Sequence, residues 1–380
     1  MEMDPRYYIN LLMHLMNDGT VFLLPSVLPL IVLEYGFAYS TAGLVSAIMP
    51  FCLGVLQTPI GRLSDRLSNT LLLKVGLLIV AVGSILTAMV PMLFIPSLFL
   101  IGIGGSFYHP VGYAYTSKII KNSGSGTALG LQVSSGDLGI LVAFLTAGPI
   151  ALIWGWRATF LLWGAMGVAV LAISSFYLKE EKTTLQIRSS STGLSLLKKK
   201  EAILIMILFT ILGAISRILS TYLPTLFFIK GLDITISDII TGIYIATGIA
   251  GGIISGRLVD KFGGKNVTIF LFASTTIVLA AMYAIASIGF EVLMVAAVGI
   301  AAVGLYPGLY LMMRQATSSK IVGTSYGLLL SLGMLSGIAS VTIGGYIVDI
   351  APQMIYVFGA MLAFLGVAFS IKLPKFNNGD

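Results

Sequence analysis

The chain has 380 residues, of which 57% are hydrophobic and only 10% are charged, and its mean hydropathy is +1.00. Soluble domains carry about 25% charged residues, so this composition indicates a membrane protein with little room for a soluble domain. The single cysteine excludes an intramolecular disulfide framework. The net charge of +7 does not by itself indicate a nucleic-acid-binding protein, because the basic residues follow a membrane topology, as shown below.

Apolar segments of about 20 residues, the length that crosses a bilayer, recur along the whole chain. Twelve helices are predicted, at residues 7–33, 42–62, 71–90, 93–117, 126–152, 158–178, 202–229, 237–258, 266–287, 291–316, 324–348 and 354–373. The N-terminus lacks a basic region and a small-residue cleavage site, so the first apolar segment is expected to be retained as a helix. The only long polar connection, residues 179–200, is predicted to link two six-helix bundles at 1–178 and 201–380.

Basic residues gather on one side of this predicted topology. If the linker is cytoplasmic, the connections and tails on its side carry Arg6, Arg62, Arg66, Lys74, Lys118, Lys121, Arg257, Lys261, Lys265, Arg314, Lys320, Lys372 and Lys375. The positive-inside rule then predicts a multi-pass protein of the cell membrane with both termini in the cytoplasm. The excess charge is expected to contact anionic lipid headgroups and not nucleic acid.

The two halves of the chain repeat. The segment Gly61–Arg66 recurs as Gly256–Lys261, and Pro29 recurs as Pro224, with the same offset in each case (256 − 61 = 195 and 224 − 29 = 195). In the later helices Pro110 recurs as Pro307 and Thr127 as Thr324, with an offset of 197 (307 − 110 and 324 − 127). Parallel repeats of this kind are a transporter architecture with the substrate site between the repeats. The sequence therefore predicts an all-α membrane protein with twelve transmembrane helices in two pseudo-symmetric six-helix bundles.

The repeated loops Gly61-Arg-Leu-Ser-Asp65-Arg66 and Gly256-Arg-Leu-Val-Asp260-Lys261 resemble the signature loop of the major facilitator superfamily. The resemblance covers essentially the whole chain, because the helix count, the central linker and the duplication also agree. Glycine permits close helix approach, and an aspartate can meet a positive helix end. We expect a conformational latch formed by Gly61, Asp65, Arg66, Gly256, Asp260 and Lys261; the alternative is a static loop with positive-inside charges.

A polar cluster lies inside the first predicted span. A helix turns 100° per residue, so His14 and Asp18 share one face, with Asn17 beside them. An ionisable group in hydrocarbon costs on the order of 3 kcal/mol or more, and such groups usually mark an ion or substrate path. The alternative is a hydrogen bond that packs one helix against another.

Two motifs make the resemblance narrower. The sequences His14-Leu-Met-Asn17-Asp18 and Phe107-Tyr-His109-Pro110 look like motifs of the fosmidomycin resistance branch of the superfamily, and Gly130-Leu-Gln132-Val133 also fits. The resemblance implies proton-coupled efflux of a drug or metabolite, with His14, Asn17, Asp18 and His109 as coupling and substrate residues.

The chain departs from that branch at three places. Val111 replaces the glutamate that commonly follows the His-Pro pair, and Asp137 stands where relatives have asparagine. Ala143-Phe144 replaces a Gly-Pro pair in the region associated with antiport. Asp137 could therefore restore a carboxylate near the fourth helix.

The predicted site residues fall into two groups. Histidine titrates near neutrality, so proton coupling is assigned to Asp18, His14, His109 and Asp137. Substrate binding is assigned to Asn17, Arg217, Tyr108, Tyr222, Tyr306 and Tyr310. Arginine suits carboxylate or phosphate recognition, although Arg217 could instead form a permanent structural ion pair. Two histidines and two carboxylates also suit a transition metal, but no cysteine or repeated close spacing supports a cage, so neither metal nor cofactor is expected.

These features together predict a secondary transporter that works by alternating access. The first prediction is proton-coupled export of a small organic compound, with anionic compounds among the candidates. Uptake of an organic acid by a symporter or facilitator is the alternative. An intramembrane enzyme or a receptor ranks last, because the chain lacks zinc-protease, serine-hydrolase and phosphate-loop motifs. The expected partners are the substrate, protons and membrane lipids, and a monomer is expected.

Overall fold

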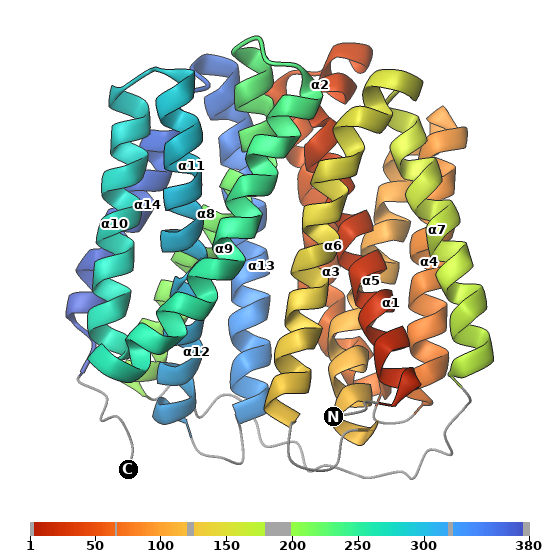
Figure 1. Ribbon diagram of the computed structural model, residues 1–380, viewed down its shortest axis with the longest axis horizontal. Coiled ribbons are helices and arrows are strands. Elements are labelled where there is room, and N and C mark those ends of the chain that lie inside the picture. The colour runs from red at the N-terminus through yellow and green to blue at the C-terminus, as the bar shows by residue number, and fades with distance from the viewer. Residues whose placement is uncertain (1–3, 65–66, 120–124, 179–198, 318–321, 375–380) are drawn as a thin grey trace. The chain divides into compact units, whose positions relative to one another are not determined.

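The computed structural model describes residues 4–64, 67–119, 125–178, 199–317 and 322–374 (Figure 1). Within these ranges the chain forms fourteen α-helices and one short 3-10 helix, and it contains no strand. Twelve helical segments of the described chain are long and apolar enough to cross a membrane. The predicted number of spans is therefore confirmed.

The helices follow the predicted spans closely. The first half contains α1 (Pro5–Val21), α2 (Leu23–Tyr35), α3 (Tyr39–Ser64), α4 (Asn69–Met89), η1 (Pro91–Leu93), α5 (Phe94–Ile119), α6 (Ser125–Trp154) and α7 (Trp156–Tyr177). The second half contains α8 (Lys200–Ile229), α9 (Ile234–Phe262), α10 (Gly264–Ala284), α11 (Ile288–Val303), α12 (Leu305–Ala316), α13 (Val322–Ile350) and α14 (Met354–Ile371). Of the predicted latch, Asp65 and Arg66 lie outside the described residues, as does most of the predicted linker.

Two spans that were predicted as continuous helices are each broken into two. The first breaks at Phe22, between α1 and α2, and the tenth breaks at Gly304, between α11 and α12. Pro25 and Pro307 lie three residues beyond these breaks. Proline has no N–H to donate to the carbonyl four residues earlier, and its ring crowds that carbonyl, so a proline weakens the helix at each break.

The helix contacts divide the chain into two compact units. The first unit comprises Met1–Ile31, Ile48–Arg188 and Asp233–Asp238, and the second comprises Val32–Ala47, Ser189–Leu232 and Ile239–Asp380. Two short segments thus group with the other half of the sequence. The predicted boundaries of the bundles, with a linker at 179–200, stay a prediction.

In the first unit, α1 packs against α4, α5, α6 and α7. Glycine allows the closest of these approaches, since a Cβ atom on Gly139 of α6 would clash with the Leu15 carbonyl group of α1. This packing buries polar side chains of α1, because Asn10, His14 and Asn17 keep 3% or less of their surface exposed. Buried polar groups need partners, so the neighbouring helices must supply them.

In the second unit, α8 packs against α13 in the same way. A Cβ atom on Gly213 of α8 would lie 2.6 Å from the Cα atom of Gly333. Another contact involves the segment before Ala47, where the Asp349 carboxylate accepts hydrogen bonds from the backbone N–H groups of Tyr39 (2.6 Å) and Ser40 (2.9 Å). Asp349 thereby caps the start of α3.

Candidate functional site

One carboxylate oxygen in the first unit faces two imidazoles. Asp18 Oδ2 lies 3.2 Å from His14 Nε2, one turn away on α1, and 3.6 Å from His109 Nε2 on α5. The other oxygen, Oδ1, accepts a hydrogen bond from Asn17 Nδ2 at 2.8 Å. Asp18 and His109 are 13% and 18% exposed, whereas His14 is 2% exposed. The carboxylate therefore contacts two imidazoles, and imidazole is the side chain whose ordinary pKa lies nearest neutrality.

A glycine on α6 leaves the space that this cluster occupies. A Cβ atom on Gly136 would lie 2.6 Å from His14 Nε2 and 2.7 Å from Asp18 Oδ2. Any other residue at this position would push the acid and the imidazole out of place. Gly136 was not among the predicted site residues, although it lies directly before Asp137 in a run of small residues.

Asp137 completes the group of residues predicted to couple protons. It is partly buried on α6, and it is close enough to Asp18 and His14 to interact with both electrostatically. The four predicted coupling residues, from α1, α5 and α6, therefore come together in one unit. Their role in coupling stays a prediction.

Other side chains hold His14 in place. Its Nδ1 atom lies 2.6 Å from the backbone carbonyl oxygen of Gln132, and its ring stacks on Tyr108 with centroids 4.3 Å apart. The Tyr108 hydroxyl donates to the Asn10 carbonyl at 2.8 Å and accepts from Gln132 Nε2 at 3.2 Å. Asn10 was not predicted, and Gln132 was noted only as part of a motif.

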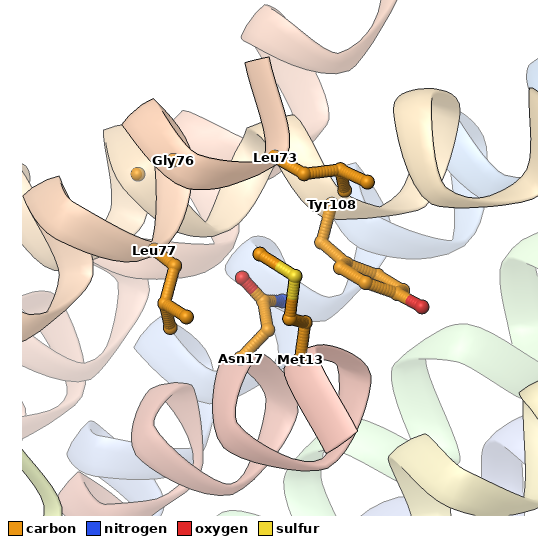
Figure 2. Close-up of a pocket in the computed structure, with 7 residues that line it drawn as sticks. Met13, Asn17, Leu73, Gly76, Leu77 and Tyr108 are labelled. Carbon is orange, nitrogen blue, oxygen red and sulfur yellow. The ribbon is translucent and has the colours of Figure 1, made fainter. Parts of the chain in front are cut away.

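The side of α1 that faces α4 is closely packed. Figure 2 shows Met13 and Asn17 facing Leu73 and Leu77, with Tyr108 alongside. The crevice between these residues has no space for a water molecule. It is a helix-packing contact and does not form a substrate chamber.

The predicted substrate residues of the second unit lie at two places. Tyr306 and Tyr310 of α12 form a ring cluster with Phe209 of α8, with centroids 5.4 to 6.3 Å apart. Farther along α8, Arg217 Nη2 lies 3.5 Å from the Met334 sulfur, and the Tyr222 hydroxyl donates to the Val341 carbonyl at 2.8 Å. These contacts of Arg217 and Tyr222 are with α13. Phe209 was not among the predicted site residues.

The described latch residues lie at the ends of α3 and α9. A Cβ atom on Gly61 would lie 3.5 Å from the Pro110 side chain, whereas one on Gly256 would meet no described atom within 4 Å. Asp260 and Lys261 are exposed. The latch function stays a prediction.

The histidine cluster also has the composition of a metal site. His14, Asp18 and His109 each offer a ligand atom, and these atoms lie within 4.8 Å of one another. Within the described part of the chain, no fourth histidine, cysteine or carboxylate joins them. Structural metal sites usually have four protein ligands, so the expectation that the site binds protons and no metal is kept as a prediction.

Comparison with known protein families identifies the family to which this chain belongs. A family model described as Major Facilitator Superfamily matches residues 11–289. The chain belongs to the major facilitator superfamily. It is therefore a transporter and not an enzyme, which confirms the predicted family and class.

This facilitator has relatives that carry the names of resistance proteins. It is 23% identical over 386 residues to the Fosmidomycin resistance protein of Escherichia coli (strain K12), an alignment that covers 97% of this chain and 92% of that protein. It is 26% identical over 275 residues to the Multidrug resistance protein MdtG of Yersinia enterocolitica, covering 67% of this chain and 65% of that protein. The first match confirms the narrower resemblance.

Solved structures share the fold. A crystal structure of a bacterial homologue of the human lysosomal transporter Spinster matches with a TM-score of 0.86 at 13% identity, covering 97% of this chain and 96% of that chain. A mutant of the nucleoside transporter NupG matches with a TM-score of 0.79 at 15% identity, covering 97% of this chain and 100% of that chain. These matches confirm the major facilitator fold of a multi-pass membrane protein.

Proposed function

We propose that this transporter couples the movement of a small organic compound to the movement of protons. Asp18 is the proposed group that alternates between its charged and protonated forms. The observation that carries the proposal is the single oxygen, Asp18 Oδ2, between the Nε2 atoms of His14 and His109. A charged Asp18 attracts either imidazolium strongly in a poorly solvated place. A proton on Asp18 removes that attraction, so proton binding changes how tightly α1 is held to α5.

This change is the proposed link to alternating access. When the hold of Asp18 on His109 weakens, α1 and α5 separate more easily, and the facilitator reaches its other state. The loops that contain Asp65 and Asp260 are proposed to act as the latch, whose contacts break and form again during that transition. A shift in population between the two states of alternating access requires only that the proton binds to them with different affinities.

Export is the proposed direction, and the names of the resistance proteins from Escherichia coli and Yersinia enterocolitica support it. Arg217, Tyr306 and Tyr310 are proposed to contact the substrate, and the Arg217 guanidinium favours a compound that carries an anionic group. The proposed location is the cell membrane with both termini in the cytoplasm. A substrate-induced pH change of the opposite sign in vesicles would instead support uptake.

The test is Asp18→Asn in purified, reconstituted protein. Fosmidomycin is the first probe, followed by phosphonates and organic acids chosen by thermal shift, because a bound ligand raises the melting temperature. Transport driven by a pH gradient should fall at least about a hundredfold, while the melting temperature stays within a few degrees. The matched control, Glu201→Gln in the first turn of α8, should transport normally. Unchanged transport by Asp18→Asn would remove Asp18 from the mechanism.

A further inference from the structure

The two nitrogens of His14 have different surroundings. Nδ1 lies 2.6 Å from the Gln132 carbonyl oxygen and 3.2 Å from Ser135 Oγ. The carbonyl can only accept a hydrogen bond, and the Ser135 hydroxyl donates its one hydrogen to the same carbonyl at 2.7 Å. Both groups therefore face Nδ1 as acceptors, and Nδ1 must carry a hydrogen.

A hydrogen on Nδ1 leaves Nε2 as the nitrogen that exchanges protons. Nε2 faces Asp18 Oδ2 at 3.2 Å. Without a proton between them, a nitrogen lone pair would face a carboxylate oxygen, and the two would repel. The pair is therefore stable as imidazolium with carboxylate, or as neutral imidazole with carboxylic acid, and each form holds one proton on the Nε2–Oδ2 line.

Two helices hold the His14 ring in this orientation. The Tyr108 ring of α5 stacks on it with an interplanar angle of 14°, and the Tyr108 hydroxyl is tied to Asn10 and Gln132. Gln132 of α6 is fully buried and supplies the carbonyl. The ring stacking and hydroxyl hydrogen bonds of Tyr108 are with α1 and α6, which makes it a positioning residue for His14.

His109 lacks an equivalent constraint. Its Nδ1 atom is buried and makes no hydrogen bond to any described residue, whereas its Nε2 atom lies 3.6 Å from Asp18 Oδ2. It is also the more exposed of the two imidazoles, at 18% against 2% for His14. Water therefore reaches His109 more readily than His14.

We propose that the Gln132 carbonyl and the Tyr108 ring lock His14 in its Nδ1–H tautomer, so that His14 and Asp18 store one shared proton, which His109 exchanges with water. This inference rests on the proposed proton coupling. In the step, His109 Nε2 takes a proton from a hydronium ion and leaves a water molecule. That N–H bond breaks as an O–H bond forms at Asp18 Oδ2, and the O–H bond breaks in turn as an N–H bond forms at His14 Nε2. The titratable groups that face His14 are Asp18 on α1, Tyr108, His109 and Tyr113 on α5, and Asp137 on α6.

Nitrogen-15 NMR of histidine-labelled full-length protein tests the lock directly. The chain has only two histidines, so His109→Gln leaves the signals of His14 alone. From about pH 5 to about pH 9, Nδ1 should stay protonated while Nε2 alone changes. A neutral ring with the hydrogen on Nε2, or a mixture of both tautomers, would overturn the proposal.

Tyr108→Phe tests the positioning role. It removes the hydroxyl that ties the ring to Asn10 and Gln132, so the pH midpoint of transport should move by about half to one unit, with mixed tautomers in the NMR spectrum. Tyr356→Phe removes a buried tyrosine hydrogen bond in the second unit and should leave the pH profile unchanged. An unchanged profile and tautomer in Tyr108→Phe would exclude the positioning role. Failure of proton coupling itself is distinguished by Asp18→Asn, because the tautomer measurement does not depend on transport.

Discussion

The same arrangement of three rings occurs in both units of this facilitator, with different chemistry. The matching ring centroids are 5.3 and 5.5 Å apart for the first pair, 6.2 and 5.4 Å for the second, and 6.3 Å in both units for the third. The rings belong to His14, His109 and Tyr113 in the first unit and to Phe209, Tyr306 and Tyr310 in the second. The offsets are those of the sequence repeat (209 − 14 = 195, 306 − 109 = 197 and 310 − 113 = 197). The duplication thus preserved the packing while the two clusters acquired different side chains.

Among the described residues, the two ring clusters differ in the presence of an acid, Asp18, which only the cluster of the first unit has. The counterpart of Asp18 is Gly213 (213 − 18 = 195), whose Cβ would lie 2.6 Å from the backbone of Gly333. Gly136 and Gly333 are also counterparts (333 − 136 = 197), but only Gly136 faces a carboxylate. The helices of the first unit leave room for an acid, and those of the second unit close that room. One copy therefore holds a carboxylate beside its rings, and the other holds an aromatic cluster.

The largest expected effect comes from the buried acid of the second unit. Glu291 is 1% exposed, pairs with Lys230, and accepts a hydrogen bond from the Tyr356 hydroxyl at 2.8 Å. Both partners of Glu291 are fixed side chains of the second unit, so we expect this acid to have a structural role. Glu291→Ala should lower the free energy of unfolding by about 3–5 kcal/mol, because it leaves the partly buried Lys230 ammonium unpaired. Chemical denaturation in detergent would measure this loss, and a loss no larger than that of Asp18→Asn would contradict the contrast between the two acids.

The next effect concerns the closed space at Gly213. Gly213→Ala should lower the free energy of unfolding by about 1–3 kcal/mol, because the new methyl group would meet the Gly333 backbone. Gly252→Ala, in the same unit, is the matched control, since a Cβ there meets no described atom within 4 Å. That control should be neutral, or stabilising by about 0.5–1 kcal/mol. Equal melting temperatures for the two variants would show that α8 and α13 are not closely packed at Gly213.

The counterpart glycines test the site itself. Gly136→Ala should reduce proton-driven transport by at least about tenfold, because the methyl group would separate His14 from Asp18. In Gly333→Ala the methyl group would lie 3.0 Å from the edge of the Phe209 ring, so coupling should persist with at most a modest loss of rate. Transport assays at several pH values compare the two, and an equal loss of coupling in both would remove the functional distinction between the clusters.

The smallest effect lies outside the membrane, at the start of α1. The Arg6 side chain donates hydrogen bonds to Asp4 and lowers the pKa of its carboxyl, and Asp4 also caps the helix. Because the folded pKa is the lower one, this stabilisation is present above the unfolded pKa and is lost as the pH falls through the folded pKa. Asp4→Ala should cost about 0.5–2 kcal/mol near neutral pH and less in acid. Thermal melting at several pH values measures this loss of stability. A loss in Asp4→Ala that does not change with pH would contradict the prediction.

Several parts of this structure could be predicted from the sequence because they depend on one helix at a time. The positions of the twelve spans follow from local hydropathy, and the shared face of His14 and Asp18 follows from the helical turn. The breaks at Phe22 and Gly304 were harder to predict, since α5 continues through Pro110 while α11 ends before Pro307. A proline marks a weak point, and tertiary packing decides whether the helix breaks there.

The sequence by itself determined the membrane class, the duplication and the candidate residues of the polar cluster. Only the tertiary structure decided that His14 and His109, from different helices, share one oxygen of Asp18, and that a backbone carbonyl of α6 binds the far side of His14. A backbone carbonyl is present at every residue, so no pattern of side chains marks the one that matters. The room at Gly136 depends in the same way on the surfaces of two packed helices, and no single helix encodes both.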